Sequence, residues 1–202
     1  MSVLQARRRL LLVPQTVPLL RHTFSGASLT PSDLGPSLTA HAGTFAGSGG
    51  VCWCSSDTNG DNATADVGAA NLYARVTIRG TLASATDFRE PQLIVRYLDA
   101  NNYLSIRSVS GSAYQLLKTD GGSASVIATA AATFLDGTDY RFEVRCAGNR
   151  IEAFLDGVSK FVHVLSGGDT KYSAYTRVGL RLRKSGSPAT AASWDDLLVW
   201  TP

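Results

Sequence analysis

Cysteine, histidine and glutamate are scarce in this chain of 202 residues. An odd number of cysteines, three, excludes a complete disulfide framework. Cys52 and Cys54 would lie on the same side of a strand, where such neighbours rarely bridge each other. We therefore expect buried or half-buried thiols, and the alternative is one bridge from Cys146 to Cys52 or Cys54. The three histidines lack the spacing of a closed metal site.

Long apolar runs are also missing, because no stretch reaches the roughly 20 residues that span a bilayer. Arg8 and Arg9 precede Leu-Leu-Leu-Val and faintly resemble a twin-arginine signal, but Pro14 and Pro18 interrupt the apolar run. Two prolines also favour extended backbone. We therefore expect an extended arm over residues 1–21 and one domain over residues 22–202.

The net charge of +3 is modest, and the charged residues are unevenly distributed along the chain. Residues 1–24 contain four arginines and no acidic residue, whereas the rest of the chain has 15 basic and 16 acidic residues. The basic character therefore belongs to the arm, and the sequence predicts neither a nucleic-acid partner nor a membrane partner.

Helical periodicity is absent too, since no segment of ten or more residues keeps a 3.6-residue period. Apolar and polar residues alternate instead, as in the segment NLYARVTIR, and turn signals such as Asp136-Gly137 and Asp156-Gly157 punctuate the chain. This pattern predicts two packed antiparallel sheets, with any helix limited to one turn. Between residues 25 and 70, we expect strands only at SLTA, TFAG and VCWCS. The expected core includes Val76, Ile78, Leu93, Val95, Leu104, Ile106, Phe142, Val144, Ile151, Leu155, Leu180 and Leu182.

A β-hairpin is predicted around a four-residue polar loop, Asp99 to Asn102. Strict alternation would place Leu93, Val95, Tyr97, Leu104 and Ile106 on its core face. The opposite face would present Arg96, Tyr103, Ser105 and Arg107.

Three segments together resemble a known family: LIVRYLDANNYLSIRS, FLDGTDYRFEVRCAGNRIEAFLDGVSKF and TRVGLRLR…ASWDDLLVW. They are similar to the laminin-G-like, concanavalin A-like lectin/glucanase jelly rolls, over about residues 65–201. The resemblance implies an all-β, two-sheet antiparallel jelly-roll sandwich. In this family the paired acids Asp195 and Asp196 commonly support a neighbouring loop or sheet edge, so we expect a structural role for them.

The resemblance also implies a shallow concave surface on one sheet, where aromatic rings could stack on sugars and arginines could bind hydroxyl or carboxylate groups. The candidates for glycan binding are Tyr73, Arg75, Arg96, Tyr103, Ser105 and Arg107. The competing interpretation is that these are ordinary solvent-facing strand residues.

Retaining glucanases of this fold carry carboxylates in a Glu-x-Asp-x-x-Glu pattern. The only glutamates here, Glu90, Glu143 and Glu152, do not form it. Glu143 and Glu152 alternate with arginines, as solvated surface charges do. We therefore expect a protein that is not an enzyme, and a hydrolase with an unrecognised site is the minority alternative.

No cofactor is expected, with one weak exception. Asp57, Asn59 and Asp61 repeat the first half of a calcium loop, but Asn62 stands where that loop needs glycine. An Asx-rich turn is the favoured interpretation, and a calcium site is the alternative.

The Ala/Thr/Gly-rich texture resembles the structural or minor tail proteins of bacteriophages. The expected function is a non-enzymatic virion protein, a minor tail or surface decoration protein, whose lectin-like domain binds host cell-wall polysaccharide. The arm would contact other virion proteins or copies of itself, and the alternative is that it lies along its own sandwich as an edge strand. The alternative is a secreted bacterial carbohydrate-binding module, with an extracellular location. The arm residues chosen for assembly are Arg7, Arg8, Arg9, Leu11, Leu12 and Val13.

Overall fold

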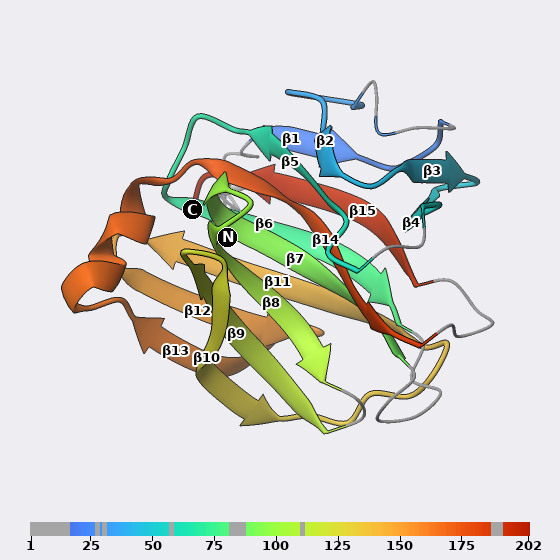
Figure 1. Ribbon diagram of the computed structural model, residues 1–202. Coiled ribbons are helices and arrows are strands. Elements are labelled where there is room, and N and C mark those ends of the chain that lie inside the picture. Colours follow the sequence, from blue (N-terminus) through green and yellow to red (C-terminus); the bar gives the residue numbers. More distant parts are fainter. Residues whose placement is uncertain are drawn as a thin grey trace, which may run out of the picture.

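The protein folds into two antiparallel β-sheets packed face to face (Figure 1), as the alternation predicts. The computed structural model describes residues 17–26, 29, 32–56, 59–80, 88–109, 112–186 and 192–202. The arm residues named above, Arg7 to Val13, and the calcium candidate Asp57 lie outside the described residues. The predicted all-β sandwich of two antiparallel sheets is confirmed.

The strands divide into a sheet of eight and a sheet of seven. The eight-stranded sheet contains β1 (Leu20–His22), β3 (Phe45–Ser48), β4 (Val51–Cys54), β6 (Leu72–Arg79), β11 (Asp139–Ala147), β12 (Arg150–Leu155), β13 (Val158–Val164) and β15 (Ser193–Trp200). The seven-stranded sheet contains β2 (Thr39–Ala42), β5 (Asn62–Asp66), β7 (Phe88–Asp99), β8 (Asn102–Val109), β9 (Ala113–Asp120), β10 (Ser123–Ala131) and β14 (Arg177–Ser185).

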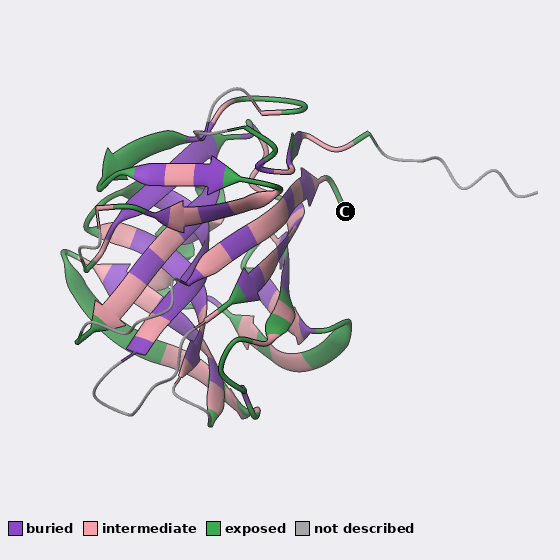
Figure 2. Ribbon diagram, turned by 90° about the vertical axis from the view of Figure 1, so that its right-hand side faces the viewer, coloured by how far each residue is buried: buried purple, intermediate pink, exposed green. Residues whose placement is uncertain are grey.

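The core lies between the two sheets, where buried and more exposed residues alternate along the strands (Figure 2). All twelve predicted core residues are buried, including Val76, Phe142 and Leu180. The three cysteines are free and buried, so the expectation of buried thiols is confirmed. Burial raises the pKa of the Cys52 thiol to about 12.

Two elements differ from expectation. β5 was not expected, because its small residues Ala63, Thr64 and Ala65 carry no strong apolar alternation. It pairs with β14 at a close approach, since a Cβ on Gly179 would lie only 1.9 Å from the Ala63 carbonyl oxygen. The helix η1 (Gly167–Ala174) is a 3-10 helix of eight residues, which is longer than the single turn expected.

A β-bulge in β7 overturns part of the predicted hairpin. Between Ile94 and Tyr97, β7 has one residue more than the paired stretch of β14, and Arg96 has a φ of 55°. Such a bulge reverses the alternation beyond it. Tyr97 therefore packs with Ile94 and Tyr103 in a separate cluster and not in the core, whereas Arg96 is fully buried. Asp99 pairs with Asn102, which shortens the expected four-residue loop to two residues.

The described chain enters the sandwich before residue 22. Leu20 pairs with Val199 of β15 and is fully buried, and the Leu19 backbone N–H donates to the Val199 carbonyl at 2.7 Å. The last residues of the expected arm therefore belong to the eight-stranded sheet. In the part of the chain that the structure describes, no helix has the length and hydropathy to cross a membrane.

Candidate functional site

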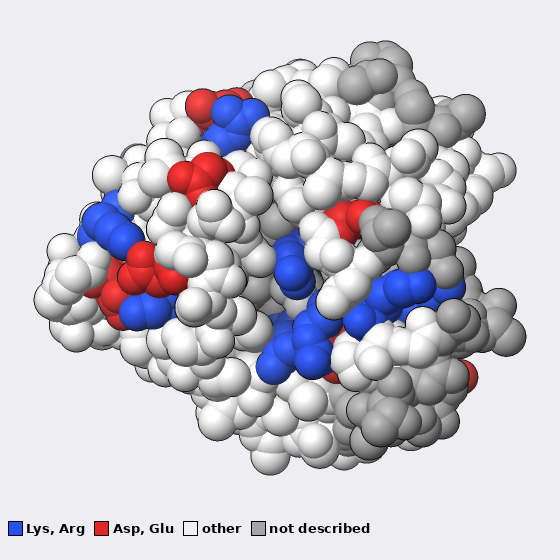
Figure 3. All heavy atoms as spheres, in the orientation of Figure 1, with Lys and Arg blue, Asp and Glu red and all other residues white. Residues whose placement is uncertain are grey.

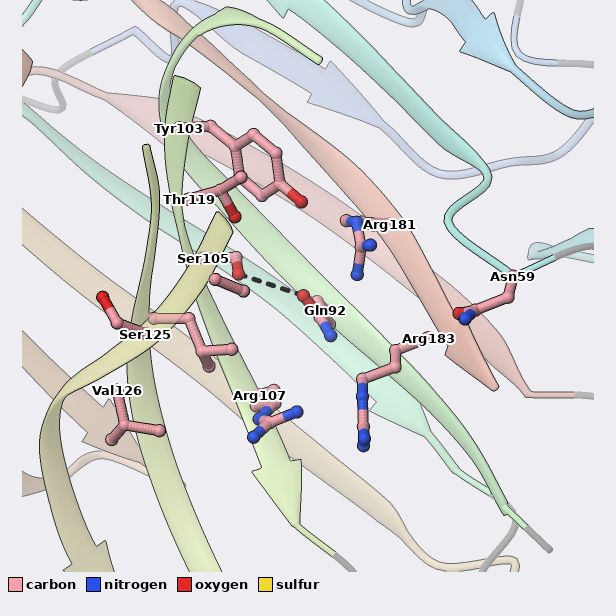
Figure 4. Close-up of a pocket in the computed structure, with 12 residues that line it drawn as sticks. Asn59, Gln92, Tyr103, Ser105, Arg107, Thr119, Ser125, Val126, Arg181 and Arg183 are labelled. Carbon is pink, nitrogen blue, oxygen red and sulfur yellow. Dashed lines mark hydrogen bonds between the residues drawn. The ribbon is translucent and has the colours of Figure 1, made fainter. Parts of the chain in front are cut away.

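The outer face of the seven-stranded sheet contains a pocket of about 280 Å³. Basic side chains gather in and below the hollow at the middle of this face (Figure 3). Figure 4 shows polar side chains from β7, β8 and β14 directed into it. The lining residues are Asn59, Gln92, Tyr103, Ser105, Arg107, Leu117, Thr119, Ala124, Ser125, Val126, Arg181 and Arg183.

Strand register places guanidinium and amide groups in alternation across the floor of this pocket. Arg181 of β14 pairs with Gln92 of β7, Gln92 pairs with Arg107 of β8, and Arg107 pairs with Gln115 of β9. Directly paired residues of neighbouring strands project from the same face of a sheet. Four adjacent strands therefore contribute one polar row, from Arg181 to Gln115.

Hydrogen bonds within the row leave one buried donor unused. The Ser105 hydroxyl donates to Gln92 Oε1 at 3.0 Å, as drawn in Figure 4. Gln92 is fully buried, and its Nε2 has no hydrogen-bond partner among the described residues. The Arg107 guanidinium donates to Gln115 Oε1 through Nε at 3.1 Å and Nη2 at 2.9 Å.

The charges of the pocket are mostly positive. The charged residues in its lining are three arginines, and one buried carboxylate, Glu90, lies beside two of them. Glu90 Oε2 is 2.9 Å from Arg183 Nη1 and 3.8 Å from Arg107 Nη1. Burial lowers the pKa of Arg107, and the charges of Arg183 and Arg181 act in the same direction, whereas Glu90 opposes them.

An aromatic row borders the pocket. The rings of Tyr97 and Tyr103 stack with centroids 5.9 Å apart, and the His41 ring stacks with that of Tyr97 at 5.0 Å. The Arg181 guanidinium lies 5.8 Å from the centre of the Tyr103 ring. Tyr103 is thereby held with its hydroxyl group directed into the pocket (Figure 4).

The structure brings together three of the six predicted glycan-binding residues, Tyr103, Ser105 and Arg107. Arg96 does not join them, because the bulge turns its side chain away from this face. Its guanidinium instead donates to the backbone carbonyls of Tyr172, Ser173 and Gly148.

Tyr73 and Arg75 lie on β6 of the other sheet. The Tyr73 hydroxyl donates to Glu143 at 2.7 Å, and its ring is 4.6 Å from that of Trp200. Burial, with the hydrogen bond to Glu143, raises the pKa of Tyr73. Glu143 is only 5% exposed, so its expected role as a solvated surface charge was wrong.

Arg75 pairs with Asp196 at 3.3 Å. Tyr73 and Arg75 therefore belong to a separate surface, and the single face expected for all six residues was wrong.

Sequence reasoning missed Gln92, Arg181 and Arg183. The alternation of arginine with leucine in Leu180-Arg181-Leu182-Arg183 was available as a signal, because it gives both arginines the phase opposite to the core.

Of the two described calcium candidates, Asn59 lines the pocket and Asp61 does not. Asn59 Oδ1 accepts a hydrogen bond from the Lys184 backbone N–H at 3.1 Å, and Asp61 accepts one from the Ser56 hydroxyl at 2.5 Å. Among the described residues, no group of three or more His, Cys, Asp or Glu side chains is arranged to hold a metal ion.

No protein-family model matches the chain, and no curated protein sequence matches it. Solved structures do match its fold. The carbohydrate-binding module CBM66 from Bacillus subtilis aligns at a TM-score of 0.62 with 16% identity, covering 81% of this chain and 95% of that one. The CBM2 module of the evolved Dit protein of Lactobacillus casei BL23 phage J-1 aligns at 0.61 with 11% identity, covering 91% and 95%.

A carbohydrate esterase from the Shiga toxin-encoding bacteriophage phi24B aligns at a TM-score of 0.59 with 13% identity, covering 93% of this chain and 100% of that one. These likenesses show that the chain has the fold of lectin-like jelly rolls. Two of the three come from bacteriophages.

Proposed function

We propose that this chain is a non-enzymatic, glycan-binding domain of a bacteriophage virion, displayed on the tail or particle surface. The observation that carries the binding function is the pocket on the seven-stranded sheet, with its tyrosine ring, hydroxyl and amide groups and arginines. Sugars present ring faces and hydroxyl groups, which aromatic and hydrogen-bonding side chains bind. The carbohydrate-binding modules of the same fold support this assignment.

A binding role also suits the charges of the pocket. A glycosidase of the retaining type needs two carboxylates about 5 Å apart. The charged lining residues are Arg107, Arg181 and Arg183, which bind a ligand but do not supply a general acid and a nucleophile. Because a phage carbohydrate esterase has this fold, a hydrolase is the competing functional class. Release of acetate or of reducing ends from a bound polysaccharide would establish that class.

The test of glycan binding compares one tyrosine from each sheet. Tyr103→Ala should weaken retention on purified host cell-wall polysaccharide by about tenfold, because it removes a ring and a hydroxyl group from the pocket. Tyr73→Ala, on the opposite sheet, is the matched control and should bind normally. Both variants should be checked for folding by thermal melting. Loss of retention in Tyr73→Ala alone would move the site to the other sheet.

The virion location has its own test. The phage origin of two structural relatives supports it, whereas the Bacillus module supports a secreted bacterial carbohydrate-binding module as the second candidate. Tail and capsid genes beside the coding sequence, and antibody labelling of purified particles, are expected for the virion protein. A gene that lies among secreted glycanases, with no label on particles, would favour the second candidate.

A further inference from the structure

We propose that the pocket recognises an acidic glycan, binding a carboxylate or phosphate group of the sugar between Arg181, Gln92 and Arg107. The inference rests on the proposed glycan-binding function and adds the chemical class of the ligand. Carboxylates and phosphates share the feature that matters here, which is two or more oxygens carrying negative charge.

Positive charge exceeds negative charge around the pocket. Glu90 lies within ion-pairing distance of Arg183 and Arg107, so one negative charge is shared by two arginines. Among the described residues, Arg181 forms no ion pair, and its contact is the face of the Tyr103 ring. A bound anion would supply the missing charge in a partly buried site, where attraction is screened less than at an open surface.

The pocket also contains a buried hydrogen-bond donor, the Gln92 amide. Within the described part of the chain, Gln92 Nε2 has no hydrogen-bond partner although the side chain is fully buried, and leaving such a group unpaired is costly. The Ser105 hydroxyl occupies Gln92 Oε1, which leaves the NH₂ group to face the pocket between the two guanidinium groups (Figure 4). An acceptor oxygen is therefore the group that this position lacks.

Arg181 and Arg107 are the strand partners on either side of Gln92, so their side chains project from the same face of the sheet as the Gln92 amide. Arg107 already donates to Gln115 through Nε and Nη2, so it contributes mainly charge, while Arg181 presents its guanidinium group to the pocket. A guanidinium group presents paired N–H donors that match two oxygens of a carboxylate or phosphate. A neutral sugar hydroxyl can accept such bonds, but it does not neutralise the charge.

The experiment measures binding of the full chain to four probes: polygalacturonate, its methyl ester, poly(glycerol phosphate) teichoic acid and neutral dextran. Arg181→Gln removes the unpaired charge, and Arg145→Gln is the matched control. Arg145 is an exposed arginine of β11 on the other sheet, so both variants lower the net charge equally. We expect Arg181→Gln to weaken binding of an acidic probe about tenfold and Arg145→Gln to leave it within about twofold.

The possible outcomes distinguish recognition of an acidic group from glycan binding in general. Binding to polygalacturonate but not to its ester identifies a carboxylate, and binding to the teichoic acid identifies a phosphate. Either affinity should fall when salt is raised from 0.05 to 0.5 M. Equal binding to the acid and its ester, unchanged by salt or by Arg181→Gln, overturns the acidic ligand while glycan binding stands. Binding to none of the probes and to no cell-wall polysaccharide overturns both.

Discussion

The guanidinium of Arg96 on β7 donates a hydrogen bond of 3.2 Å to the carbonyl of Gly148, which lies between β11 and β12 of the opposite sheet. Its other amino group donates to the Tyr172 and Ser173 carbonyls of η1. The side chain is fully buried. One residue of the seven-stranded sheet thereby ties the helix and a turn of the eight-stranded sheet to the core.

Arg96→Ala should therefore lower the free energy of unfolding by about 2–4 kcal/mol, because it empties a packed site and leaves carbonyl groups unpaired. Urea denaturation measures this change. Arg145→Ala is the surface control and should change the free energy by less than about 0.5 kcal/mol. An unchanged midpoint for Arg96→Ala would mean that desolvation of the guanidinium offsets its hydrogen bonds.

Phe142→Ala should cost about 3–5 kcal/mol of unfolding free energy, since the ring is almost completely buried. Phe142 packs edge-on against Tyr114 with centroids 4.8 Å apart, and also contacts Phe134. Thermal and urea unfolding should show the loss, while circular dichroism at low temperature keeps a β-sheet spectrum. A loss below about 1 kcal/mol would show that neighbouring rings collapse into the space.

The sequence predicts the sandwich well where alternation is unbroken. Along β6, every second residue is apolar and buried, because the strand has one face toward the core. In β11, Phe142, Val144 and Cys146 follow the same pattern, whereas Tyr140 is half-buried. The alternation fails as a guide at Arg96, where the bulge adds one residue and exchanges the faces of Arg96 and Tyr97. A bulge is set by contacts with neighbouring strands, so the local sequence does not reveal it.

The pocket could be predicted only in part for a similar reason. Tyr103, Ser105 and Arg107 share one strand, and their phase follows from the sequence alone. Gln92 and Arg181 come from β7 and β14, which are distant in sequence and become neighbours through strand pairing. Their proximity depends on which distant strands become neighbours, and the alternation within one strand does not reveal that pairing. Tyr73 has a suitable phase but belongs to the other sheet.

The native cysteines should resist alkylation. All three are buried, and burial raises the pKa of Cys52 and that of Cys146, so little reactive thiolate forms near neutral pH. Iodoacetamide at pH 8 should label none of them in native protein and all three in guanidinium chloride, as mass spectrometry can count. A rapidly labelled thiol in the native protein would show that part of the sandwich opens locally.

The N-terminal segment joins the sandwich at a definite point, and truncation on either side of that point should have different effects on stability. The described chain is already bound to the eight-stranded sheet at Leu19 and Leu20, whereas Val17 is 74% exposed. Deletion of residues 2–16 should therefore leave the free energy of unfolding within about 1 kcal/mol of the full chain. Deletion of residues 2–21 also removes Leu20, a fully buried side chain, and should cost about 2–5 kcal/mol.

The shorter deletion also tests whether the arm directs assembly, under the proposed virion role. Residues 2–16 include Arg7, Arg8 and Arg9 and no acidic residue, and such a segment can be guided to an acidic surface of a neighbouring subunit. The variant lacking residues 2–16 should keep its melting temperature and its glycan binding but disappear from purified particles, as immunoblotting would show. Replacing the three arginines with glutamine should give the same loss, and raised salt should weaken incorporation of the unchanged protein. Normal incorporation of the shortened protein would mean that the sandwich itself makes the assembly contacts. A lowered melting temperature would mean that the deleted residues stabilise the fold.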